Sequence, residues 1–239
     1  MDDTDPFATP HRLPTPNRPL LGLTILVVED SLYACEAMRL LCLRSGARIR
    51  RADCLKSARR HLQVYRPSVV IIDLGLPDGS GEDLIAELAM TVPRVGIILG
   101  TSGDDFAENA AIAAGADGFL AKPVRSLAVF QNAVLSRLAS DRQPSGPRDV
   151  TDEVIHPDKI AYQDDMAHVA DVLSDLSDGK VLDYVAQFVG GVARSAHDTI
   201  LAKAAEDLAR ARANGGPVAT DTARIAGLVQ ERLEQKRAI

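Results

Sequence analysis

The sequence has no long apolar run, so we predict no membrane-spanning segment. Its start combines early acidic residues with several prolines and lacks a basic segment followed by an apolar one. We therefore expect a disordered arm over residues 1–20 and no secretory signal.

Cysteine is scarce: Cys35, Cys42 and Cys54 form no CxxC pair. An odd number of cysteines without an export signal favours a reducing, cytoplasmic location. Cys35 and Cys42 are two helical turns apart on an apolar face, so we expect them to be buried as small hydrophobic side chains.

Basic residues are outnumbered, with 27 Lys and Arg against 33 Asp and Glu and a net charge of -6. Within residues 150–239 the counts are ten and fifteen. Because affinity for DNA depends on basic contacts to backbone phosphates, we predict that DNA is not a partner.

Short apolar runs and helical patterns alternate through the first part of the chain. We predict strands at 24–28, 47–52, 69–72, 95–99 and 118–121, and helices at 31–45, 55–65, 81–90, 105–114 and 126–139. Such alternation predicts an α/β fold: a doubly wound, five-stranded parallel sheet with helices on both faces.

After a polar linker at 141–150, no strand-like run remains. Residues 151–239 carry three apolar stripes at helical spacing: Met166 to Leu176, Val181 to Leu208, and Ile225 to Leu233. We predict an all-helical module that binds protein partners or forms a homodimer, its stripes buried between chains or against the first domain.

Polar residues follow the predicted strands where a parallel sheet gathers a site. They are Glu29, Asp30, Asp73, Gly100, Thr101, Ser102, Lys122 and Pro123. Carboxylates brought together need a cation, and oxygen-only ligands favour Mg²⁺. A lysine and a hydroxyl beside them suit a phosphoryl group.

These residues, with "DLGLPDGSG" and "GADGFLAKP", resemble the receiver domain of two-component response regulators, which has a flavodoxin-like fold. The resemblance covers about Leu23 to Ala139, and we assign the receiver domain to residues 21–140. It implies a response regulator of phosphorelay signal transduction, phosphorylated by a histidine kinase or a histidine phosphotransfer protein. We predict that the protein is not an enzyme.

The resemblance also implies a role for each residue. Asp73 would accept the phosphoryl group and bind Mg²⁺ with Asp30 and the Gly75 carbonyl, while Glu29 would act through water. Lys122 and Thr101 would bind the phosphoryl oxygens. The remaining assignments are Thr101 and Phe119 as switch residues and a cis peptide bond before Pro123.

The sequence leaves open which residue supplies the hydroxyl that the resemblance implies for binding the phosphoryl group. An ungapped comparison counted back from Gly115 places Gly100 there, a one-residue deletion restores Thr101, and Ser102 is a third candidate. We favour Thr101.

Two alternative functions fit the sequence less well. A haloacid-dehalogenase-like phosphatase needs a second Asp two residues after the nucleophile, where this chain has Gly75. A divergent phosphotransfer module would use His197, placed on a predicted long helix, but lysine and glycine are absent from the expected following positions, Ile200 and Leu201. Gly190-Gly191 within the same pattern indicates a kink or a close helix contact.

Overall fold

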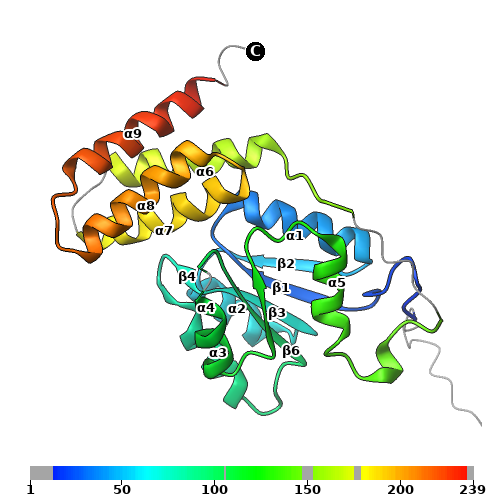
Figure 1. The fold of residues 1–239 in the computed structure, drawn as a ribbon. Coiled ribbons are helices and arrows are strands. Elements are labelled where there is room, and N and C mark those ends of the chain that lie inside the picture. The colour runs from blue at the N-terminus through cyan, green and yellow to red at the C-terminus, as the bar shows by residue number, and fades with distance from the viewer. Residues whose placement is uncertain (1–12, 105, 147–152, 175–178, 236–239) are drawn as a thin grey trace, which may run out of the picture.

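The computed structural model describes residues 13–104, 106–146, 153–174 and 179–235. It consists of an α/β unit and, next to it, a bundle of helices formed by the second part of the chain (Figure 1). No helix in these ranges combines the length and the apolar character needed to cross a lipid bilayer.

Five parallel strands form the central sheet, in the order β2-β1-β3-β6-β7. Their bounds are Thr24–Val28 (β1), Arg48–Ala52 (β2), Val69–Asp73 (β3), Ile97–Ser102 (β6) and Gly118–Ala121 (β7). A small antiparallel pair, β4 (Gly75–Leu76) and β5 (Gly79–Ser80), follows β3 directly. The predicted five-stranded parallel sheet is therefore confirmed.

Helices cover both faces of this sheet, because β1, β3 and β6 are apolar on both sides. One apolar cluster includes Met38 and Phe130, and the other includes Leu84 and Ala111. The first lies under α1 (Leu32–Ser45) and α5 (Leu127–Leu135); the second lies under α2 (Leu55–Val64), α3 (Gly81–Met90) and α4 (Ala107–Ala114).

Four further helices carry the apolar stripes of the second part, which pack on one another within the chain. They are α6 (Lys159–Ser174), α7 (Gly179–Ser195), α8 (Thr199–Ala213) and α9 (Ala219–Glu234). We call them the helical module. The stripe predicted from Val181 to Leu208 is broken into α7 and α8, because Asp198 accepts a hydrogen bond from the Leu201 amide and starts a new helix.

Several predicted boundaries differ from the structure. Residues 1–12 of the predicted arm lie outside the described residues, whereas Leu20 is fully buried in the α/β core. The fourth strand begins later and extends to Ser102, so Gly100 and Thr101 lie within β6. Residues 153–155, assigned above to the helical module, pair with the start of α5, and Ile155 packs in the α/β core.

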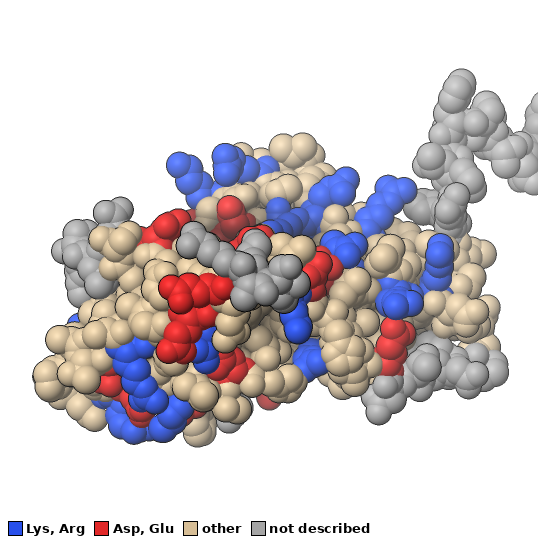
Figure 2. All heavy atoms as spheres, turned by 90° about the horizontal axis from the view of Figure 1, so that it is seen from above, with Lys and Arg blue, Asp and Glu red and all other residues tan. Residues whose placement is uncertain are grey.

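Basic and acidic side chains are interspersed on the face of the helical module seen from above (Figure 2). Ion pairs join its helices: Arg212 of α8 binds Asp183 of α7 at 2.7 Å, and Arg224 of α9 binds Asp207 of α8 at 3.2 Å. Such exposed pairs contribute little individually, so the buried apolar stripes account for most of the packing energy.

Candidate functional site

Three carboxylates meet where β1 and β3 end. Val28 of β1 is paired with Ile72 of β3, which brings the following residues, Glu29 and Asp73, side by side. One carboxylate oxygen from each of Glu29, Asp30 and Asp73 lies within 4.8 Å of the others. Because β1 lies between β2 and β3, this is also where the strand order reverses and α/β sheets bind ligands.

Lys122, which follows β7, bridges two of these acids. Its Nζ lies 2.6 Å from Glu29 Oε2 and 2.7 Å from Asp73 Oδ2, and the lysine side chain is only 11% exposed. The peptide bond between Lys122 and Pro123 is cis. The short distance to Asp73 Oδ2 places the Lys122 ammonium against the predicted phosphoryl acceptor.

The electrostatics of the site favour a further cation. Burial, together with the charges of Asp73 and Asp30, raises the pKa of Glu29 to about 8 although Lys122 opposes the shift. Burial and the Asp73 charge raise the pKa of Asp30 to about 6. Burial alone would lower the pKa of Lys122, but Asp73 and Glu29 raise it above the usual range. One lysine does not neutralise three acids, and hard oxygen ligands at this spacing fit Mg²⁺.

Two hydroxyls lie near the acids on β6, and they face different neighbours. Thr101 is paired with Asp73 across the sheet, but its hydroxyl donates to the Leu120 carbonyl at 2.7 Å. Ser102 lines a cavity that lies over the three acids. At Gly100, a Cβ would lie 2.7 Å from the Ala111 side chain, so tight packing against α4 requires glycine there.

Phe119 does not line this cavity. It is half-buried and packs with the cluster under α2, α3 and α4, beside Gly100. Its predicted switch role and that of Thr101 stay predictions.

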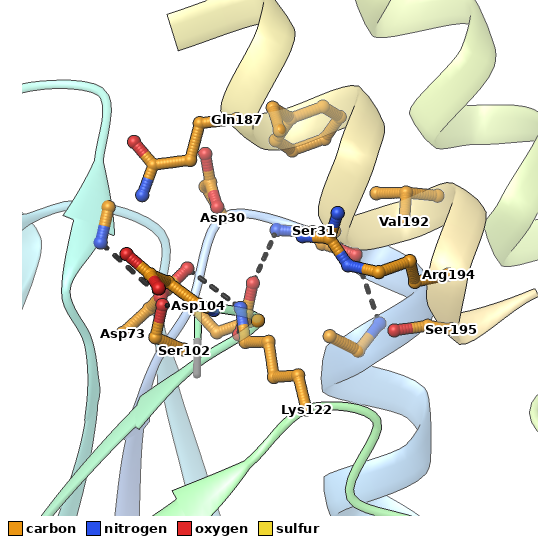
Figure 3. A pocket seen from close by; sticks show the side chains of 16 residues that line it. Asp30, Ser31, Asp73, Ser102, Asp104, Lys122, Gln187, Val192, Arg194 and Ser195 are labelled. Atoms are coloured by element: carbon orange, nitrogen blue, oxygen red, sulfur yellow. Dashed lines mark hydrogen bonds and ion pairs between the residues drawn. The ribbon is translucent and has the colours of Figure 1, made fainter. Parts of the chain in front are cut away.

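A cavity of about 270 Å³ lies over the acids and is closed from above by α7 (Figure 3). We call it the acceptor cavity. Its sheet side includes Glu29, Asp30, Asp73, Gly75, Ser102 and Lys122, and its α7 side consists of Gln187, Phe188, Gly191, Val192, Arg194 and Ser195. Residues of the receiver segment, from 29 to 122, and residues of α7, from 187 to 195, therefore share one site.

Direct bonds hold the helical module on this site. The Tyr184 hydroxyl of α7 donates to Asp30 Oδ2 at 2.9 Å. The fully buried Asp165 of α6 accepts bonds from the Ser31 hydroxyl and from the Leu32 and Tyr33 amides, at 2.7 to 3.0 Å. Asp165 of the helical module thus accepts hydrogen bonds from the first amides of α1 in the α/β unit, which have no partner within their own helix.

Sequence reasoning missed these α7 and α6 residues. Tyr184, Gln187 and Arg194 have the helical spacing of ordinary surface positions, and nothing local reports which surface they meet. The unusual Gly190-Gly191 pair on α7 was the available signal, since glycine in a helix interior needs a reason.

His197 lies outside the acceptor cavity. It occupies the turn between α7 and α8 with a positive φ of 59°, and its ring is bonded to Arg125 of the α/β unit. Its predicted place on a long helix was wrong, because the helix ends at Ser195.

Comparison with known protein families matches residues 25–133 to the response regulator receiver domain. This segment of the chain is a receiver domain. The match contains all of the acids and Lys122. No family matches the helical module in this comparison.

Curated relatives are similar to part of this chain. The KDP operon transcriptional regulatory protein KdpE of Escherichia coli is 32% identical over 99 residues, which is 41% of this chain and 44% of KdpE. The probable transcriptional regulatory protein TcrX of Mycobacterium tuberculosis is 29% identical over 136 residues, or 56% and 58% of the two chains. The chain thus spans about half the length of these relatives.

Solved structures similar to part of this chain include two response regulator or receiver proteins. A putative response regulator from Chloroflexus aurantiacus is 30% identical, with a TM-score of 0.40, and the match covers 42% of this chain and 85% of that chain. The receiver domain of a histidine kinase from Syntrophus aciditrophicus is 24% identical, with a TM-score of 0.45, covering 52% and 97%.

The prediction that DNA is not a partner was wrong. KdpE, TcrX and the similar PhoP proteins are all transcriptional regulatory proteins by name. Net charge misled the prediction because contacts to DNA depend on where individual Lys and Arg side chains lie and not on their sum.

Proposed function

We propose that this protein is a two-component response regulator that accepts a phosphoryl group on Asp73 and passes the change to the helical module. The observation that carries this proposal is the position of Asp73. One of its oxygens is bound to Lys122, and the carboxylate lines a cavity with room for a transferred group.

In the proposed reaction, an Asp73 carboxylate oxygen attacks the phosphorus of a phosphohistidine on a partner kinase or phosphotransfer protein. The new P–O bond forms as the P–N bond breaks. The electron pair of the broken P–N bond stays on the imidazole nitrogen, which then takes up a proton. Lys122 holds a phosphoryl oxygen and offsets the developing charge. We expect no turnover of an external substrate.

Mg²⁺ fits the site, and Asp30, Asp73 and Glu29 would hold it, with Gly75 at the cavity wall. When bound, the ion supplies positive charge beside the phosphoryl oxygens. Lys122 orients Asp73 in the same cavity, since it contacts both Asp73 and Glu29.

Incubation of the full chain with Mg²⁺ and acetyl phosphate, followed by intact mass measurement, tests this function. We expect the mass gain of one phosphoryl group in the wild type and none in Asp73→Asn. A gain that persists in Asp73→Asn would place the acceptor elsewhere.

The output is proposed to pass through the helical module because α7 forms a wall of the acceptor cavity. Its binding partner is a protein or DNA. The names of KdpE and TcrX favour a role in transcription. A mobility-shift assay at low salt, with and without acetyl phosphate, tests DNA; pull-down of a phosphorylation-dependent protein complex tests the protein partner.

A further inference from the structure

Arg194 is a half-buried cation that lines the acceptor cavity. It extends from α7 toward the cavity, which it lines together with Asp73 and Lys122 (Figure 3). Its Nε is fully enclosed, and no group in the described part of the chain accepts a hydrogen bond from it. An unmet guanidinium donor in a buried place is costly, so its position calls for an acceptor that is not part of the protein.

Two glycines, Gly103 and Gly190, lie against this side chain. A Cβ at Gly103, which follows β6, would lie 2.8 Å from Arg194 Nη2, and a Cβ at Gly190 would lie 3.2 Å from Nη1. Gly191 lines the cavity and adds no side chain to it. Gly190 of the glycine pair in α7 therefore has a local explanation, since it leaves room for the Arg194 guanidinium.

The charges of the cavity point to the same ligand. Four acids line the cavity, Glu29, Asp30, Asp73 and Asp104. Only two cations, Lys122 and Arg194, accompany them, so the protein supplies two cations fewer than acids. A divalent ion offsets that difference of two charges, and a phosphoryl group on Asp73 replaces a single negative charge by about -1.5 to -2. Arg194 thus brings the loaded cavity close to neutrality, and a guanidinium is well suited to bind phosphoryl oxygens.

We propose that Arg194 binds the phosphoryl group on Asp73 directly, so that the helical module supplies a ligand to the phosphorylated receiver domain. This inference rests on the proposed function. In this proposal α7 binds the phosphoryl group through Arg194, and the bound group holds α7 more tightly on the cavity.

Beryllofluoride, a tetrahedral analogue of the phosphoryl group, tests the proposal in the full chain. Its binding at saturating Mg²⁺ is measured by ¹⁹F NMR for the wild type, Arg194→Gln and Arg194→Lys. Arg210→Gln on α8 is the matched control, because it removes an exposed Arg from the same module. We expect Arg194→Gln to weaken binding about tenfold or more, Arg194→Lys to weaken it less, and the control to have no effect.

Mg²⁺ binding without the anion separates this contact from damage to the site. Arg194→Gln should bind Mg²⁺ at least as well as the wild type, since it removes a positive charge from the cavity. Wild-type anion affinity in Arg194→Gln, or a parallel loss of Mg²⁺ binding, would overturn the inference. If the wild type bound no more anion than Asp73→Asn, the proposed function itself would fail.

Discussion

Lys122 is the residue on which the charge balance of the site depends. It lies between Glu29 and Asp73 and is almost fully enclosed. Removing one partner of a buried ionic cluster leaves the others uncompensated, which costs far more than losing a surface pair. The residue thus has a structural effect that is measurable before any phosphoryl transfer.

Lys122→Met should lower the free energy of unfolding by about 3–5 kcal/mol in a chelator, because two buried carboxylates lose their counter-charge. Added Mg²⁺ should restore more stability to this variant than it adds to the wild type. Urea unfolding with and without Mg²⁺ measures both effects.

Arg59→Gln is the control for Lys122→Met. It breaks an exposed pair with Glu87, which should cost at most about 1 kcal/mol. Equal losses in the two variants would show that the acids at the site are not held by Lys122.

Residue types and order were sufficient to predict which side chains of the receiver domain meet. Glu29, Asp73 and Lys122 each follow a short apolar strand, and parallel strands bring such positions to one edge. The orientation of Thr101 was not predictable, because its hydroxyl donates to a carbonyl on the neighbouring strand and no local pattern reports that bond.

At the scale of elements, strands and helices of the receiver domain followed the apolar pattern closely. The exceptions have physical causes. β6 continues through polar residues because the ladders with β3 and β7 satisfy its backbone up to Ser102. The break between α7 and α8 was missed because the apolar spacing runs through it, while Asp198 caps the new helix.

Asp198 also ties the helical module together. Arg232 of α9 binds it at 2.8 Å, and the Tyr162 hydroxyl of α6 donates to it at 2.9 Å. Burial alone would raise its pKa, but the hydrogen bonds from Arg232, Leu201 and Tyr162 hold the pKa of Asp198 below its usual range.

A lowered pKa gives the sign of the pH dependence. The stabilisation is present above the unfolded pKa near 3.9 and is lost as the pH falls through the lower folded value. Asp198→Asn, which keeps a good helix cap, should therefore be destabilised at pH 5 and much less so at pH 3. Urea unfolding at both pH values measures this, and an equal deficit at the two would contradict it.

At the scale of the whole molecule, the notable feature is that the helical module closes the acceptor cavity of the receiver domain. Gln187 and Arg194 line it from α7, and Tyr184 of the same helix donates to Asp30. Asp165 of α6 accepts bonds from the start of α1. Sequence patterns could predict two folded parts but not their docking, which depends on side chains far apart in the chain.

Asp165→Ala should loosen this docking, because it leaves three donors at the start of α1 without their acceptor. We expect faster amide exchange at Leu32 and Tyr33 and a loss of about 1–3 kcal/mol in stability. Asp164→Ala is the matched control, since its side chain is exposed beside Asp165. Identical exchange in both variants would show that Asp165 does not hold the modules together.

Hydrogen exchange of α7 tests most directly the claim that this helix reads the phosphoryl state of Asp73. The amides of residues 184–195 are followed in the full chain with Mg²⁺, before and after acetyl phosphate. We predict slower exchange over these residues in the phosphorylated wild type and no change in Asp73→Asn. Unaltered exchange in a wild type shown by mass to be phosphorylated, or the same slowing in Asp73→Asn, would contradict the account.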